Sequence, residues 1–213
     1  RLLNGARRLH LGLALAGPTD AEAWRQTLAL AEWADRSGFD SFWLPEGHLR
    51  PGATSAPLLT LAAVAARTQR LRLGTTSLLL SIHDPARVAA DVAALDQLSA
   101  GRVILGVGRG FEPAMFKAFG IDPKSKRDRF DDALDAILAA WADGGAAEGD
   151  RLRPFQSPHP PIWVAAFGPK GLAQAARRGA PYLASPIESV VSAPVGSCSS
   201  KARARPANAS RVA

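Results

Sequence analysis

The stretch that decides the fold runs from Leu71 to Gly110: LRLGTTSLLLSIHDPARVAADVAALDQLSAGRVILGVGRG. Residues 71–80 are apolar or β-branched around a glycine, which predicts a strand buried on both faces of a parallel sheet. Asp84 and Pro85 suit the cap and the first position of a helix. Apolar residues then repeat on one face of this helix, at Val88, Val92, Leu95 and Leu98. A second strand at 103–107 completes a parallel β-α-β unit.

The turn at 106–110, Gly-Val-Gly-Arg-Gly, holds the first candidate site. Small residues let backbone amides approach an anion, and the planar Arg109 guanidinium can bind the anion through several N–H donors. The turn therefore indicates a cofactor that carries phosphate; a solvated surface arginine is the alternative. A Rossmann dinucleotide site is disfavoured, because the third glycine of that fingerprint is missing and the turn follows a late strand.

Similar strand and helix patterns flank this unit. Strands are expected at 9–16, 39–44, 161–166 and 181–184, helices at 19–38, 56–68, 127–142 and 169–178, and an irregular segment at 111–126. Thr19 and Glu22 fit a capping box at the first helix. About six β-α steps without hairpin signals predict an α/β fold, either a barrel or a doubly wound sheet.

Four blocks then narrow the fold to one family. They are GFDSFWLPEGH (38–48), LGTTSLLLSIHDPARVAADVAALDQLSAGR (73–102), GVGRGFEPAMFKAFG (106–120) and SPHPPIWVAA (157–166). In order and spacing they resemble the bacterial luciferase-like monooxygenases, roughly over residues 9–189. The resemblance implies a (β/α)8 TIM barrel that binds reduced FMN or, in a sister branch, the deazaflavin coenzyme F-420.

The length predicts that this barrel is incomplete. The chain has 213 residues, whereas a (β/α)8 barrel usually takes about 250. The sequence after Ser189 is rich in Ser, Ala, Pro and Arg without an apolar period, which predicts a domain at 1–189 and a disordered basic tail at 190–213. In the resembling family, strands seven and eight belong here. We therefore expect about six β-α units and an altered or truncated C-terminus.

Charge and composition exclude several classes of protein. The net charge of +7 lies at the two ends, so the neutral middle of the chain argues against nucleic-acid binding. No apolar run is long enough to span a membrane. The lone Cys198 excludes an internal disulfide and fits a reducing cytoplasm. The first residues also resemble a short signal peptide, as an alternative to a first barrel strand.

The catalytic candidates are Glu46 and His48, which follow the second strand and would lie at the C-terminal mouth of the barrel. His48 is the histidine placed for proton chemistry, and a structural loop histidine is the alternative. The resembling family often has two adjacent histidines after the glutamate, and Gly47 takes the first place here. His83 and His159 look structural, and no cluster has metal-ligand spacing.

The resemblance also implies a set of cofactor-binding residues: Thr76, Ser77, Gly108, Arg109, Arg127, Phe167, Gly168 and Gly171. The pair at 76–77 matches a non-proline cis peptide of the family, with a plain strand as the alternative. Arg127 resembles a second phosphate-side arginine, with a solvated helix start as the alternative. Gly168 and Gly171 would offer backbone amides at a helix start, although the family often has serine in place of Gly168.

Together these residues imply a flavin-dependent monooxygenase of the cytoplasm that uses reduced FMN and oxygen on a small-molecule organic substrate. A separate flavin reductase is the expected partner, and a homodimer is left open. One alternative is hydride transfer with reduced deazaflavin. The other is a non-catalytic partial barrel, which the missing strands and Gly47 favour.

Overall fold

The computed structural model describes residues 9–49, 54–142, 153–166 and 168–183. The strands are β1 (Gly12–Ala14), β2 (Ser41–Leu44), β3 (Arg72–Thr75), β4 (Leu78–Leu79), β5 (Val103–Gly108), β6 (Ile162–Ala165) and β7 (Tyr182–Leu183). The helices are α1 (Ala21–Arg36), α2 (Pro57–Arg67), α3 (Pro85–Leu98), α4 (Pro113–Ala118), α5 (Lys126–Trp141) and α6 (Gly168–Arg177), with short 3-10 turns η1 (Leu80–Ile82) and η2 (Pro123–Ser125). The tail predicted at 190–213 lies outside the described residues.

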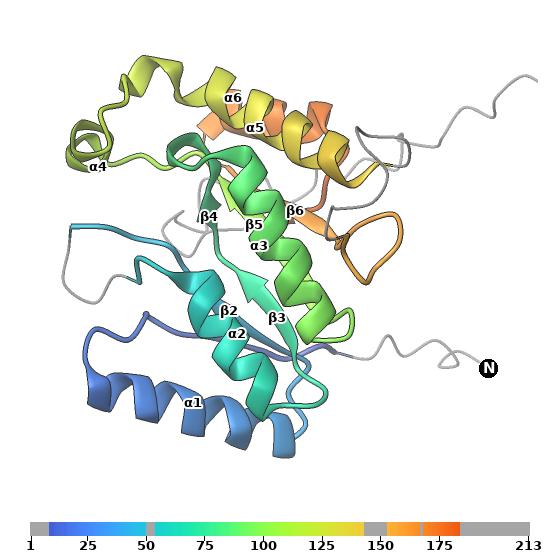
Figure 1. Cartoon of the computed structure of the whole chain (residues 1–213). Coiled ribbons are helices and arrows are strands. Elements are labelled where there is room, and N and C mark those ends of the chain that lie inside the picture. Colours follow the sequence, from blue (N-terminus) through green and yellow to red (C-terminus); the bar gives the residue numbers. More distant parts are fainter. Residues whose placement is uncertain (1–8, 50–53, 143–152, 167, 184–213) are drawn as a thin grey trace, which may run out of the picture.

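The strands form one parallel sheet in the order β1-β2-β3-β5-β6-β7, with β4 also paired to β5. Sheet order follows chain order throughout, as in a barrel, without the reversal that defines a doubly wound sheet. The helices lie on the outer side of the sheet (Figure 1). The prediction of an incomplete α/β barrel is therefore confirmed.

A pair of tryptophans shows how strongly the sheet curls. Trp43 of β2 and Trp163 of β6 have ring centroids 5.4 Å apart, although β3 and β5 lie between their strands. Three strand spacings in a flat sheet would amount to about 14 Å. The rings therefore meet across the hollow of the sheet. Gly74 of β3 makes room for them, because a Cβ atom there would lie 2.0 Å from the Trp43 ring.

The core lies between the sheet and the helices. β5 is buried along its whole length, as predicted for a strand covered on both faces. The main cluster joins side chains of β2, β3, β5 and β6 to side chains of α3 and α5, among them Phe42, Leu73, Leu105, Val164, Val92 and Phe130. This packing places the C-terminal ends of the strands at one edge of the molecule.

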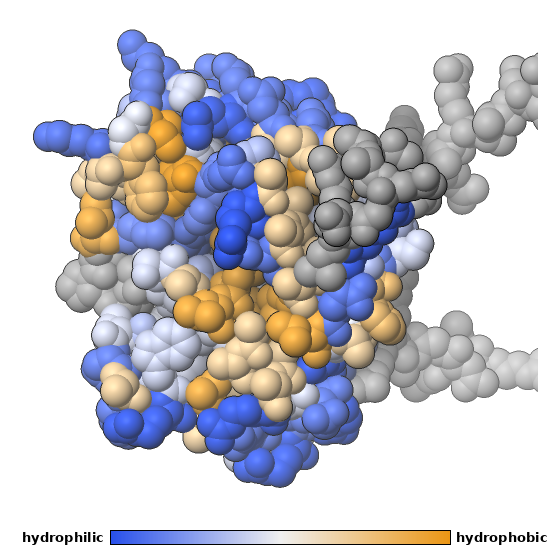
Figure 2. Space-filling model, viewed as in Figure 1, coloured by the Kyte–Doolittle hydropathy of each residue, from blue (hydrophilic) through white to orange (hydrophobic). Residues whose placement is uncertain are grey.

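The prediction for Leu98 was wrong. Its side chain is 70% exposed, because it lies about 80° around the helix from Val88 at 100° per residue, at the margin of the apolar face. Leu59 of α2 is 67% exposed as well. Figure 2 shows a hydrophobic area on the face that carries α2 and α3.

Three local predictions also need correction. Asp20, not Thr19, caps α1, with its Oδ1 2.8 Å from the Ala23 amide. The segment predicted as irregular contains α4, which begins at Pro113. The long third strand is split into β3 and β4 at the Thr76–Ser77 peptide bond, which is cis.

Asp35, in the last turn of α1, fixes the start of the third strand. Its carboxylate accepts hydrogen bonds from the backbone amides of Gln69, Arg70 and Leu71 at 2.9–3.0 Å. Burial raises the pKa of Asp35, but the three amides and the Arg70 charge outweigh that effect, so the pKa is lowered overall. The ionised carboxylate is therefore the form that stabilises the fold.

Replacing Asp35 with asparagine should lower the free energy of unfolding by about 1–3 kcal/mol at neutral pH, because a single amide oxygen cannot serve three donors. A lowered pKa makes the contribution of Asp35 complete above the unfolded value of about 4 and lost as the pH falls below it, so the difference from the wild type should shrink in acid. Urea unfolding at several pH values measures both effects. Asp91→Asn, which removes the exposed ion pair with Arg87, is the control and should change stability by less than about 1 kcal/mol.

Candidate active site

Glu46, two residues beyond β2, is the centre of a buried hydrogen-bond network. Its side chain is fully buried, and its Oε1 lies 2.7 Å from Nε2 of both His48 and His83. Its Oε2 accepts a hydrogen bond from the Leu79 amide at 2.7 Å. His48 is a neighbour of Glu46 in sequence, whereas Leu79 and His83 are 33 and 37 residues away and are brought to Glu46 by the fold.

The network holds Glu46 in its ionised form. Burial raises the pKa of this carboxyl, but the bonds and charge of His83, the Leu79 amide and His48 lower it further than burial raises it. An ionised carboxylate only accepts hydrogen bonds, so Nε2 of each imidazole carries a proton and donates it. For His48, Nδ1 is then the nitrogen left to exchange a proton with another molecule.

His48 borders a small pocket beside this network. The pocket is partly open to solvent and is lined by Glu46, Gly47, His48, Leu79, Gly110, Phe111, Glu112 and Met115. The His48 ring also meets the edge of Phe119, with centroids 4.9 Å apart. His83 is hydrogen-bonded to the same carboxylate oxygen but does not line the pocket.

The cis peptide joins this network to the end of β5. The Ser77 carbonyl accepts a hydrogen bond from the Glu46 amide at 3.3 Å. A Cβ atom on Gly108 would lie 2.2 Å from Ser77 Oγ, so the strand end can approach only because residue 108 is glycine. Glu46, Ser77 and Gly108, predicted separately, therefore lie together, and Thr76 is half-buried beside them.

Arg109 forms a second group with the start of α6. Its Nη1 is buried and has no hydrogen-bond partner within the described part of the chain. A Cβ atom on Gly171 would lie 2.5 Å from Arg109 Nη2, so the glycine provides the space that the guanidinium uses. A buried donor without a partner costs free energy unless a ligand satisfies it.

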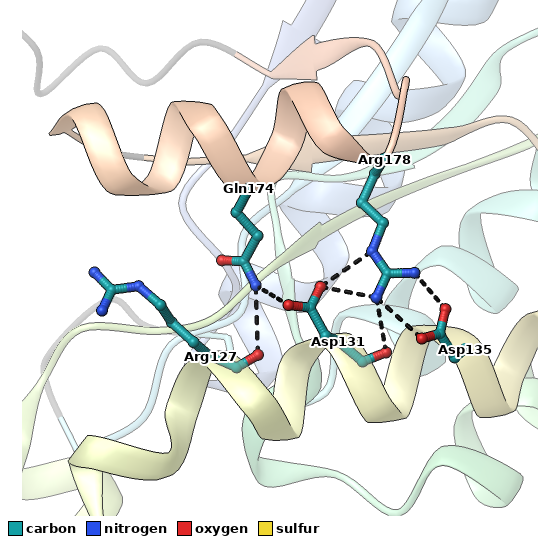
Figure 3. Close-up of polar contacts among 5 residues, drawn as sticks. All are labelled: Arg127, Asp131, Asp135, Gln174 and Arg178. Carbon is teal, nitrogen blue, oxygen red and sulfur yellow. Dashed lines mark hydrogen bonds and ion pairs between the residues drawn. The ribbon is translucent and has the colours of Figure 1, made fainter.

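Charges around Arg109 also favour an anion. Burial lowers the pKa of this guanidinium, the neighbouring Arg127 charge lowers it further, and Asp131 partly offsets both. Arg127 is exposed at the start of α5, and its side chain extends away from Asp131 (Figure 3). A phosphate group would satisfy the Arg109 fork and relieve the repulsion between the two arginines.

The remaining predicted residues and one missed residue complete the site. Gly168 begins α6 with a φ of +63° and is exposed, and Phe167 lies outside the described residues. His83, expected to be structural, is the missed member of the Glu46 network. Its only sequence signal is its place just after the third strand, next to the Asp84 helix cap. Within the described residues, no three or more His, Cys, Asp or Glu side chains are arranged to hold a metal ion.

Comparison with known proteins gives the family. The sequence model of the luciferase-like monooxygenases matches residues 9–193. The chain belongs to this family. The predicted resemblance is thus confirmed. Separately, no helix in the described ranges has the length and apolar character to cross a membrane.

Family members match this chain in sequence and in fold. The 4-hydroxyprotoasukamycin monooxygenase of Streptomyces nodosus subsp. asukaensis is 44% identical over 115 residues, which are 54% of this chain and 31% of that protein. A monooxygenase structure from Streptomyces bottropensis has a TM-score of 0.74 at 33% identity, covering 84% of this chain and 60% of that one.

A second solved structure of similar fold contains a flavin. The oxygenating constituent of 3,6-diketocamphane monooxygenase from Pseudomonas putida, in complex with FMN, has a TM-score of 0.73 and covers 82% of this chain and 56% of that one. Its identity of 23% makes this a likeness of fold alone. The chain spans about half the length of the curated relatives that it matches over most of its own length.

Proposed function

We propose that this chain forms the cofactor-binding part of a flavin-dependent monooxygenase that uses reduced FMN and oxygen on a small organic substrate. The observation that carries the proposal is the buried Nη1 of Arg109 without a partner in the described residues, beside Gly171 and Arg127. A flavin phosphate matches this fork of donors. Membership of the luciferase-like family supports FMN as the molecule that carries the phosphate.

In this proposal, the phosphate binds to Arg109 and Arg127. The backbone amides of Gly168 and Gly171 add donors at the N-terminal end of α6, where the helix dipole favours an anion. Phe167 lies outside the described residues, and we propose that it belongs to this group.

The other predicted residues act at the flavin ring and the substrate. Thr76, Ser77 and Gly108 shape the surface on which the ring lies, and the bound reduced flavin supplies the electrons that activate oxygen. Glu46 holds Nε2–H of His48, so that His48 Nδ1 can take a proton from a substrate oxygen or return it. Leu79, Phe111 and Met115 give the wall of the pocket beside His48 a mainly apolar surface.

A separate flavin reductase is the proposed partner. The FMN complex named above is the oxygenating constituent of its enzyme, and the trigonelline monooxygenase of Acinetobacter baylyi is named as an oxygenase component. We propose that this chain likewise receives its reduced flavin from another protein. We propose the cytoplasm as the location.

A homodimer is the proposed oligomeric state. The exposed apolar side chains of Leu59 and Leu98 support it, and the molecular mass measured by light scattering would test it.

Titration with reduced flavins, followed by addition of oxygen, tests this function. We expect binding of reduced FMN without oxygen, and oxygen-dependent product formation once a substrate is present. Binding of reduced F-420 with oxygen-independent turnover would favour deazaflavin hydride transfer instead. Flavin binding without turnover under either condition would indicate a non-catalytic partial barrel, and failure to bind FMN would contradict the proposal.

A further inference from the structure

The carboxylate of Asp131 in α5 is held on both oxygens by residues of the α6 region (Figure 3). Arg178 donates from Nε and Nη2 to Oδ1 at 3.0 and 2.8 Å. Gln174 donates from Nε2 to Oδ2 at 2.6 Å. Such a carboxylate has little capacity left for another guanidinium.

Arg178 has a second partner on α5. It pairs with both carboxylate oxygens of Asp135, one helical turn after Asp131. These two bonds raise the pKa of Arg178, and Arg178 lowers the pKa of Asp135. Arg178 thus bridges two carboxylates, of which Asp135 is the more exposed, at 62% against 31% for Asp131.

Asp131 is also close enough to act on the proposed phosphate site. It lies one turn after Arg127, and its partner Gln174 lies about one turn after Gly171, where a Cβ atom would be 2.5 Å from Arg109 Nη2. The Asp131 charge also favours ionisation of Arg109. A guanidinium with a free N–H can form a charge-assisted hydrogen bond with a carboxylate that reaches it. Within the described residues, no hydrogen bond joins Arg109 to Asp131, and both carboxylate oxygens of Asp131 are held by Gln174 and Arg178.

We propose that Arg178 and Gln174 are positioning residues that keep the Asp131 carboxylate away from Arg109, and so leave Arg109 free to bind the flavin phosphate. The inference rests on the proposed function. The same bonds fasten α6 to α5 and therefore keep Gly171 against Arg109 Nη2. Fastening alone would make Arg178 a structural residue, so the test must separate the two roles.

The test compares FMN with riboflavin, which lacks the phosphate, in fluorescence titrations of four proteins: wild type, Arg178→Met, Arg178→Met with Asp131→Asn, and Asp135→Asn. Arg178→Met frees the Asp131 carboxylate, so FMN affinity should fall about tenfold, as for loss of one charge-assisted contact, with riboflavin affinity unchanged. Adding Asp131→Asn removes the competing charge and should restore FMN affinity to within about threefold of wild type. Asp135→Asn leaves Asp131 held and should bind FMN as the wild type does.

A purely structural role for Arg178 predicts a different pattern. The double variant would then bind FMN no better than Arg178→Met, and riboflavin affinity would fall together with FMN affinity; either result overturns the inference. If Arg178→Met does not fold by circular dichroism, Gln174→Met replaces it, since it frees one Asp131 oxygen and keeps both ion pairs. Rescue by Asp131→Asn is again required.

The outcome also separates this inference from the proposed function. A wild type that binds FMN and riboflavin equally would remove the phosphate site itself. The other case is a wild type that prefers FMN over riboflavin and loses this preference when Arg109 is replaced. If Arg178→Met then kept the same preference, only the role of Arg178 and Gln174 would be ruled out.

Discussion

Replacing His48 with asparagine is expected to lower turnover about 100-fold to 10,000-fold, the usual contribution of a general acid or base. Asparagine keeps a polar side chain that can reach Glu46 but has no nitrogen that exchanges protons near neutral pH. The affinity for reduced FMN should stay nearly unchanged, because the lost interaction belongs to the transition state. Product formation with the first substrate found in the oxygen assay, together with an FMN titration, measures both quantities.

His83→Asn is the matched control for this variant. It removes the other imidazole from the same Glu46 oxygen, and His83 does not line the pocket. Turnover should therefore fall about 10- to 100-fold at most, as for a residue that acts only through its neighbours, and less than for His48→Asn. If His48→Asn kept full turnover, or if both variants lost it equally, His48 would be a structural loop histidine, the alternative that the sequence left open.

Arg109→Met is expected to weaken FMN binding about ten- to a hundredfold, because one charge-assisted phosphate pair contributes about 1.5–3 kcal/mol. Methionine retains much of the buried stem of arginine and removes only the charged fork. Riboflavin lacks the phosphate, so its affinity should change little. Parallel titrations of the two flavins therefore isolate the phosphate contact from any general loss of fit.

Arg87→Met provides the control for Arg109→Met. Arg87 is an exposed arginine of α3 that pairs with Asp91, far along the chain from the proposed phosphate group. Its replacement should leave both flavin affinities unchanged. Equal FMN affinities for the wild type and Arg109→Met would rule out the phosphate site at Arg109.

The sequence predicted the sheet well because each strand of a parallel barrel is locally apolar and ends in a recognisable turn. The helix cap at Asp84 follows from such local signals, whereas the barrel order of the strands was predicted from the resemblance to the family; the structure shows both. The errors were local choices between neighbours, such as Thr19 against Asp20 for the first cap. α4 was missed although Pro113 suits a first helical position, because the helix is short.

The site was harder to predict, because its contacts join residues that are distant in sequence. Glu46 and His48 belong to one motif, but nothing near His83 indicates that its ring will meet a carboxylate beyond another strand. The same holds for Asp131 and Arg178, whose bonds depend on how α5 and α6 pack. A sequence pattern or a family resemblance can indicate which residues belong to the site. It does not indicate their hydrogen-bond partners, because these depend on tertiary packing.

The tryptophan pair inside the curled sheet restricts which sequences can form it. The Trp43 ring fills the space that a side chain at Gly74 would need, and it meets Trp163 on the far side of the hollow. Enlarging residue 74 is therefore tolerable only if residue 43 becomes smaller, and residue 163 would then lose its ring contact. Substitutions at residues 43, 74 and 163, on three different strands, should therefore depend on one another. A chimera between relatives should fold only if these three residues come from the same parent.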